Sequence, residues 1–86
     1  MVARVMVDWL GLPVDVVRDL PRIVILGREE VVVSNHRGLE RYAPGQITLR
    51  SSTGRVEIEG EALRVVSVTT ESVRMAGRIH MVRVGP

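Results

Sequence analysis

The sequence predicts an all-β protein that begins with a short helix and continues as a β-rich core. Three observations support this class: apolar residues recur at every second position from Ile23 onward, glycines separate these runs, and valine is the dominant apolar residue. A period of two places alternate side chains of a strand in the core, and the branched valine side chain favours a pleated sheet. With 86 residues, the chain has room for a single domain, residues 1–86.

The N-terminal segment has a different period. Its apolar residues follow the i, i+3, i+4, i+7, i+8 spacing of one helix face: Val2, Val5, Met6, Trp9 and Leu10. Gly11 and Pro13 end this helix, and a further turn is expected before Pro21. We therefore predict a helical segment over residues 1–20. Its apolar stripe, which includes Trp9, either packs on the sheet or docks a partner protein.

The core predicted over residues 22–84 contains a repeat of about sixteen residues. Two sets of apolar residues recur at this spacing: Val31, Ile47, Leu63 and Ile79, and Val33, Leu49, Val65 and Met81. Each of the roughly four units reads as strand, turn, strand, turn. The constant spacing favours a β-solenoid-like roll, in which equivalent residues stack in columns. The alternative is an antiparallel β-meander or sandwich, in which each unit is a hairpin.

Glycines mark the expected turns, and the residue types at two of them are typical of hairpins. The structural turn glycines are predicted to be Gly27, Gly38, Gly54, Gly60 and Gly77. Thr53-Gly54 and Gly60-Glu61 resemble tight turns. Between them, residues 55–59 alternate charged and apolar residues, which predicts a strand with Val56 and Ile58 directed inward.

Composition and charge argue against several classes of function. The chain has no cysteine and two histidines, His36 and His80, without the spacing of a metal site, so neither a metal nor a cofactor is expected. Its twelve arginines alternate with acids and only two aromatic residues are present, which argues against nucleic-acid binding. No apolar run is long enough to span a bilayer, and Asp8 interrupts any signal-peptide core.

The densest polar cluster is Asn35-His36-Arg37-Gly38. Asn35, His36 and Arg37 are candidate partner-binding residues, because a guanidinium can form paired hydrogen bonds with a carboxylate. In the alternative interpretation the cluster is a structural turn, since asparagine and glycine accept positive φ. No neighbouring nucleophile marks His36 as an acid or base, so the sequence predicts no catalytic residue and no enzyme.

Two phrases and a scatter of single residues resemble the YabP/YqfC family of endospore-formation proteins. The phrases are Asp19-Leu20-Pro21-Arg22-Ile23 and Asn35-His36-Arg37-Gly38. The single residues extend over the rest of the chain: Leu12, Pro13, Gly27, Tyr42, Ile47, Gly54, Ile58, Gly60, Leu63, Glu71, Gly77 and Ile79.

The resemblance implies a protein of the mother-cell cytoplasm that acts in spore maturation near the forespore membrane. It implies an interaction or assembly module with a multi-pass membrane protein as partner. The alternative function is a self-polymerising structural β protein of a spore layer, and a homo-oligomer is compatible with either function.

Overall fold

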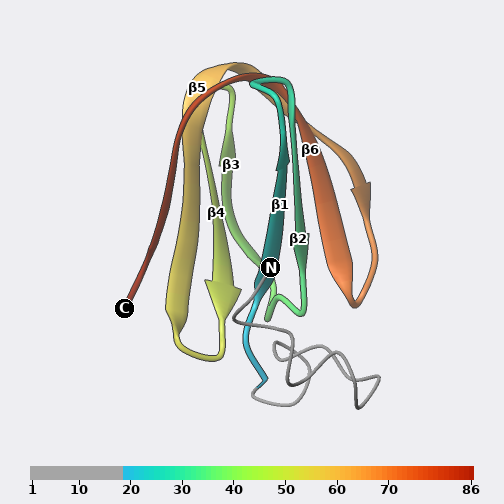
Figure 1. Cartoon of the computed structure of the whole chain (residues 1–86), viewed down its shortest axis with the longest axis vertical. Helices are drawn as coiled ribbons and strands as arrows, with labels where there is room; N and C mark the ends of the chain where they lie inside the picture. The colour runs from blue at the N-terminus through green and yellow to red at the C-terminus, as the bar shows by residue number, and fades with distance from the viewer. Residues whose placement is uncertain (1–18) are drawn as a thin grey trace, which may run out of the picture.

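From Arg22 onward, the runs of alternating apolar residues form strands, and short polar or glycine-containing segments connect them. The computed structural model describes residues 19–86, which contain six strands: β1 (Arg22–Leu26), β2 (Glu30–Ser34), β3 (Leu39–Ala43), β4 (Gln46–Ser51), β5 (Gly54–Val68) and β6 (Ser72–Gly85). They form one antiparallel sheet in the order β1-β2-β6-β5-β4-β3 (Figure 1). The all-β class predicted from the sequence is confirmed for this part of the chain.

The β-solenoid expected from the sixteen-residue spacing is wrong. Every strand pair is antiparallel, and the residues of the predicted columns are not strand partners of one another: Val31 lies opposite Met75, and Ile47 lies opposite Ile58. The four residues of the first predicted column are nevertheless all buried, with exposed fractions of 0–6%. In the second set Met81 is 40% exposed. The sixteen-residue spacing of the first set therefore identified residues that face the core. It arises because successive antiparallel hairpins have similar lengths.

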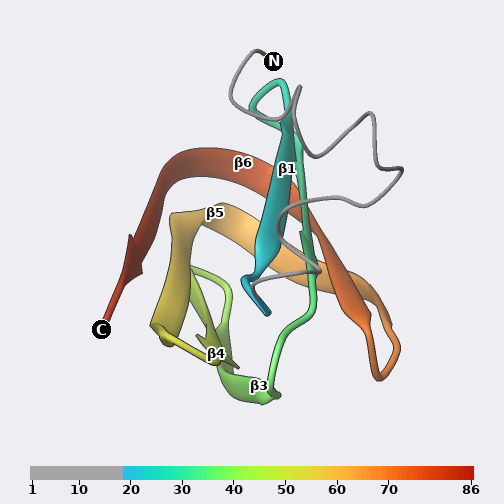
Figure 2. The same ribbon diagram turned by 60° about the horizontal axis from the view of Figure 1, so that its bottom comes forward.

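The strand order also differs from a simple meander. β3 to β6 follow one another as antiparallel neighbours, but β2 lies beside β6, at the far side of the sheet from β3. The connection from β2 to β3 therefore crosses the molecule, as Figure 2 shows. This crossing places residues 35–38 next to both halves of the fold.

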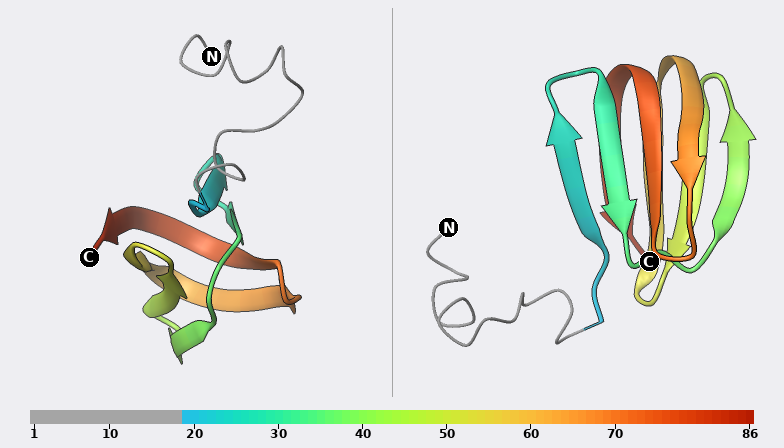
Figure 3. Two further views of the ribbon diagram at one scale, coloured as in Figure 1. Left: turned by 90° about the horizontal axis from the view of Figure 1, so that it is seen from below. Right: turned by 90° about the vertical axis from the view of Figure 1, so that its right-hand side faces the viewer.

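β5 and β6 are much longer than the other strands, and both bend. The first part of β5 pairs with β4, while the first part of β6 pairs with β2. Figure 3 shows the two long strands curving from one half of the molecule to the other. The single sheet therefore folds over on itself and encloses a core between its two halves.

The bend lies where two glycines allow the backbones of β5 and β6 to approach closely. A Cβ atom on Gly60 would lie 2.0 Å from the carbonyl oxygen of Arg78, and one on Gly77 would lie 2.7 Å from that of Ala62. The register of the β5–β6 pair shifts at the same place. The sequence predicted that Gly60 and Gly77 are turn glycines and that Gly60-Glu61 is a tight turn. Both predictions are wrong, because these residues lie within β5 and β6.

The remaining turn glycines lie at connections. Gly27 belongs to the β1–β2 turn, Gly38 to the β2–β3 connection, and Gly54 follows the two-residue turn between β4 and β5. Val56 and Ile58 are fully buried, as their alternation with charged residues predicted. The core they belong to draws on both halves of the sheet: Val31, Val33, Ile47, Leu49, Val56, Ile58, Leu63, Val73, Met75 and Ile79.

The helix predicted near the N-terminus, with Trp9, lies outside the described residues and stays a prediction. Residues 19 and 20, expected at the end of the helical segment, form a turn and an irregular link into β1. Over residues 19–86 no helix has the length and apolar character required to cross a membrane.

Candidate functional site

The polar cluster predicted after β2 is bonded to residues distant in the sequence. Asn35 adopts a φ of 61°, and its side-chain Nδ2 donates to Asp19 Oδ1 and to the carbonyl of Leu20, both at 3.0 Å. Positive φ is tolerated by asparagine better than by most residues. The Asn35 side chain therefore ties the segment that enters β1 to the end of β2.

Arg37 completes this connection through an ion pair. Its Nη2 donates to Asp19 Oδ2, and its Nη1 lies 3.4 Å from Asn35 Oδ1. Ser52, in the β4–β5 turn, donates its hydroxyl to the carbonyl of Asp19. The hydrogen bonds from Asn35 and Arg37 lower the pKa of the Asp19 carboxyl. We call Asp19, Asn35, Arg37 and Ser52 the Asp19 clamp.

His36 is directed inward and is 9% exposed. The backbone N–H of Gly38 donates to His36 Nδ1 at 3.0 Å, and His36 Nε2 lies 2.9 Å from the carbonyl of Thr69. The first contact makes Nδ1 an acceptor, so the hydrogen is on Nε2 and is donated to Thr69. Both ring nitrogens are thus engaged within the fold. His36 joins the β2–β3 connection to the β5–β6 turn.

A surface depression of about 490 Å³ lies over this cluster. Its lining includes Asp19, Asn35, His36 and Arg37 on one side and the turn around Glu71 on the other. The turn is bonded to the cluster as well, because the N–H of Asn35 donates to the carbonyl of Glu71 at 2.6 Å. These contacts favour the structural interpretation of Asn35 and His36. The Arg37 side chain, 47% exposed, is still accessible to a partner.

Sequence reasoning missed Asp19 as a member of this cluster. Glu40, three positions after Arg37, is the nearest acid to it in the sequence, but Glu40 Oε1 accepts from Arg55 at 2.9 Å. The signal was present in the family resemblance, since its two phrases contain Asp19 on one side and Asn35 and Arg37 on the other. The structure brings these two phrases into direct contact.

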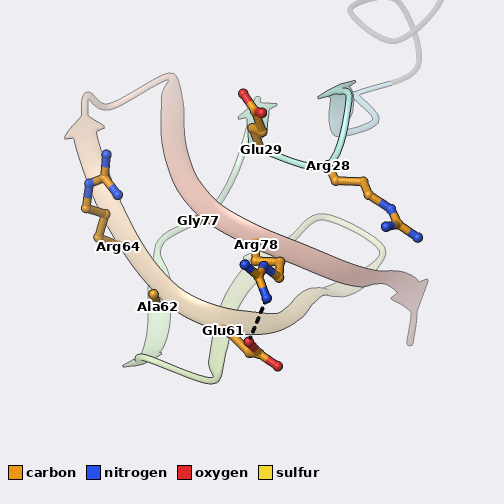
Figure 4. A pocket seen from close by; sticks show the side chains of 7 residues that line it. All are labelled: Arg28, Glu29, Glu61, Ala62, Arg64, Gly77 and Arg78. Carbon is orange, nitrogen blue, oxygen red and sulfur yellow. Dashed lines mark hydrogen bonds and ion pairs between the residues drawn. The ribbon is translucent and has the colours of Figure 1, made fainter.

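A second depression, of about 530 Å³, lies at the bend of β5 and β6. Arg28, Arg64 and Arg78 line it from three different elements, and Arg78 Nη1 lies 3.5 Å from Glu61 Oε1. Figure 4 shows that the three guanidinium groups extend in different directions rather than toward one point. Glu29 and Glu61 also line the depression, so its charge is mixed. An anion site requires guanidinium groups that converge on one point, and these do not.

The two outer strands of the sheet differ sharply in chemistry. β1 contains four uncharged apolar residues in a row, of which Val24, Ile25 and Leu26 are 38%, 51% and 48% exposed. β3 carries Glu40 and Arg41, and its pairing with β4 has an irregular register. Charges and bulges protect an edge strand from pairing with another chain, whereas a flat apolar edge invites it. By this criterion β1 is open to a further strand and β3 is protected.

The described residues contain no cluster of three or more His, Cys, Asp or Glu side chains able to hold a metal ion. His80, in β6, lies 3.9 Å from Glu61. The main polar feature of residues 19–86 is therefore the Asp19 clamp, and the main apolar surface feature is the outer edge of β1.

These features define a small antiparallel β module. The family model described as "YabP family" matches residues 19–85, and the chain belongs to this family. It is similar to the uncharacterized protein YqfC of Bacillus subtilis (strain 168), with 34% identity over 74 residues that cover 86% of this chain and 80% of that protein. No solved structure matches the chain. The resemblance noted from the sequence is thereby confirmed.

Proposed function

We propose that the chain acts in endospore formation as a non-enzymatic interaction module, in the mother cell and close to the forespore membrane. Membership of the YabP family supports the process, because the family resemblance implies proteins of spore maturation. A multi-pass membrane protein of the same process is the proposed partner. The half-exposed Arg37 and the apolar segment around Trp9 are the residues proposed to face it.

The contrast between the two outer strands is the observation that favours this function. A polymer that grows by strand addition requires two edges that accept each other. Among the described strands, β1 provides an apolar edge from Ile23 to Leu26 with its one charge, Arg22, at the end, whereas β3 presents Glu40 and Arg41 in its middle. This asymmetry supports a module of limited assembly over the alternative, a self-polymerising structural protein of a spore layer.

The function is tested in the native host. A strain that lacks the chain is complemented with the wild type or with Ile58→Asp, a core variant that should not fold, and heat-resistant spores are counted. A fluorescent fusion is imaged in the same cultures. We expect only the wild type to restore spore counts and the fusion to outline the forespore. Normal spore counts in the deletion strain, or a fusion that stays diffuse, would contradict the proposal.

The polymer alternative has its own measurement. Light scattering of the purified full chain should give a mass that reaches a plateau as concentration rises. A mass that keeps growing with concentration would instead favour the structural polymer.

A further inference from the structure

The outer edge of β1 is the surface of the described fold that most clearly lacks a neighbour. β2 pairs with one side of β1 from Arg22 to Leu26, and no described strand lies on its other side. Alternate N–H and C=O groups of an edge strand point away from the sheet and can pair with a new strand. No proline or charged residue interrupts β1 between Ile23 and Leu26.

We propose that this edge binds the same edge of a second copy of the chain, so that two molecules form an antiparallel dimer with a continuous sheet. A two-fold axis at Val24 would set Val24 opposite its own copy and Ile23 opposite Ile25 of the second molecule. Such self-pairing preserves the antiparallel arrangement of the whole sheet, and two-fold dimers are the commonest closed assemblies.

The side chains of β1 are suited to this arrangement. Ile23 and Ile25 lie opposite Val33 and Val31, both fully buried, so they are on the core face of the sheet. Ile23 packs against the core, whereas Ile25 at its rim is 51% exposed. In the dimer each Ile25 would gain the Ile23 of the other copy as a neighbour, and the two cores would become continuous. The only charged residue of β1, Arg22, would lie at opposite ends of the joint and not face its own copy.

The Asp19 clamp directs the described start of the chain away from this edge. Asp19 is bonded to Asn35 and Arg37 after β2 and to Ser52 in the β4–β5 turn. These partners hold residue 19 on the side of β2 and β4, away from the outer edge of β1. Residues 19–21 therefore lead into β1 without lying along that edge.

The assembly should stop at two molecules. The other outer strand, β3, has Glu40 and Arg41, and Tyr42 is engaged with the N–H of Val65 at 3.1 Å. The second half of β6 offers another partly open edge, since β2 pairs only with Ser72–Ala76. In that half, however, Arg83 lies between Val82 and Val84, and ion pairs hold it to Glu57 and Glu59. Val84, which is 56% exposed, therefore supplies a matched control for β1.

The test uses cysteine cross-linking of the full chain, which contains no natural cysteine. Residues directly opposite in an antiparallel pair have Cα atoms about 4.5–5.5 Å apart, within the range that a disulfide spans. We expect Val24→Cys to form a covalent dimer under mild oxidation many times faster than the control Val84→Cys. Equal rates for the two variants, or no dimer from Val24→Cys, would overturn the proposal.

Mass measurement gives an independent readout. Light scattering is run from about 1 μM to about 1 mM, because a short edge contact lies at the small, weak end of interface sizes. The wild type and Val84→Lys should approach twice the monomer mass, while Ile25→Lys stays monomeric with an unchanged circular dichroism spectrum. If Ile25→Lys fails to fold, Val24→Lys makes the same test from the other face of β1. A wild type that stays monomeric throughout, or a Val84→Lys variant that dissociates as well, overturns the dimer.

The fluorescence of Trp9, the only tryptophan, tests the alternative that the N-terminal segment of the chain binds the edge of β1. If the N-terminal segment covered β1, Ile25→Lys would shift Trp9 emission to longer wavelength without any change in mass, and this result would also overturn the dimer. The inference deepens the proposed function by naming one partner. The two can fail separately: a monomeric chain that is still required for heat-resistant spores would retain the function and lose the dimer.

Discussion

Asp19 shows how one exposed side chain organises residues that are distant in the sequence. It is hydrogen-bonded to residues sixteen, eighteen and thirty-three positions away. Its neighbours lower its pKa, so the folded protein binds a proton at Asp19 less readily than the unfolded chain does. The contribution of this carboxylate to stability is therefore complete above the unfolded pKa and is lost as the pH falls through the folded pKa.

Asp19→Asn should consequently lower the melting temperature at pH 7, and the difference from the wild type should shrink below about pH 4. Thermal melts followed by circular dichroism between about pH 7 and about pH 3 measure it. Glu29→Gln is the control, because no ion pair joins Glu29 to another described residue. A difference between Asp19→Asn and the wild type that is constant with pH would show that the charge of Asp19 has no part in the clamp.

Neighbouring residues of β5 provide a second test at this scale. Ile58 is fully buried opposite Ile47, whereas Glu57 lies on the outer face with Arg83 at 3.2 Å. Ile58→Asp should cost several kcal/mol, because it buries a carboxylate without a partner. Glu57→Ala should cost less than about 1 kcal/mol, as for other exposed ion pairs. Chemical denaturation measures both, and equal losses would mean that the inward face of β5 is wrongly assigned.

At the scale of strands, the close approach of β5 and β6 at Gly60 and Gly77 is the feature that shapes the fold. Neither position tolerates a side chain without movement of the backbone opposite. The close approach lets both strands bend, so that each belongs to both halves of the sheet. The close approach of β5 and β6 at these two glycines therefore allows the sheet to enclose the core.

Gly60→Ala should destabilise the fold by about 1–3 kcal/mol or more, the range for overpacked interiors, because its Cβ would lie 2.0 Å from the carbonyl oxygen of Arg78. Gly45→Ala is the matched control, since the nearest atom to its Cβ lies 3.8 Å away. Denaturant midpoints of the two variants can be compared directly. A Gly60→Ala protein as stable as Gly45→Ala would show that the strands separate there at little cost.

The same elements show what the sequence could and could not predict. A period of two identifies the buried face of a strand, so the burial of Val31, Ile47, Leu63 and Ile79 was predictable. It carries no information on which strand lies alongside, and the solenoid prediction failed for that reason. Gly60 was predicted to be in a turn because close backbone approach and turn formation select the same residue. For the polar cluster, the loop residues were found, but Asp19 was missed because its partners are far away in the sequence.

At the scale of the whole molecule, the two halves of the sheet cannot fold separately. β5 and β6 belong to both halves, and β2 pairs with β6 through residues as far apart as Glu30 and Ala76, forty-six positions in the sequence. Unfolding of one half would expose the core face of the other. The described residues therefore form one cooperative unit.

Val31→Ala in the β2 half and Ile47→Ala in the β4 half should each leave a single unfolding transition for the whole fold, with a lower midpoint. The free energy of unfolding should fall by about 2–5 kcal/mol for the larger truncation at Ile47. Circular dichroism and the fluorescence of Tyr42, which lies in the β3–β4 half, should report the same midpoint in both variants. Two separated transitions in Val31→Ala, with Tyr42 unaffected by the first, would contradict a shared unit.

The close approach of β5 and β6 at Gly60 and Gly77 also has an evolutionary consequence. Each glycine is required by the backbone of the opposite strand, so natural selection acts on the pair and not on either residue alone. Members of the family that keep the bend should keep both glycines, and a lineage that replaces one should also have straightened or shortened its partner strand. Diversity among these proteins is therefore expected at positions other than these two glycines.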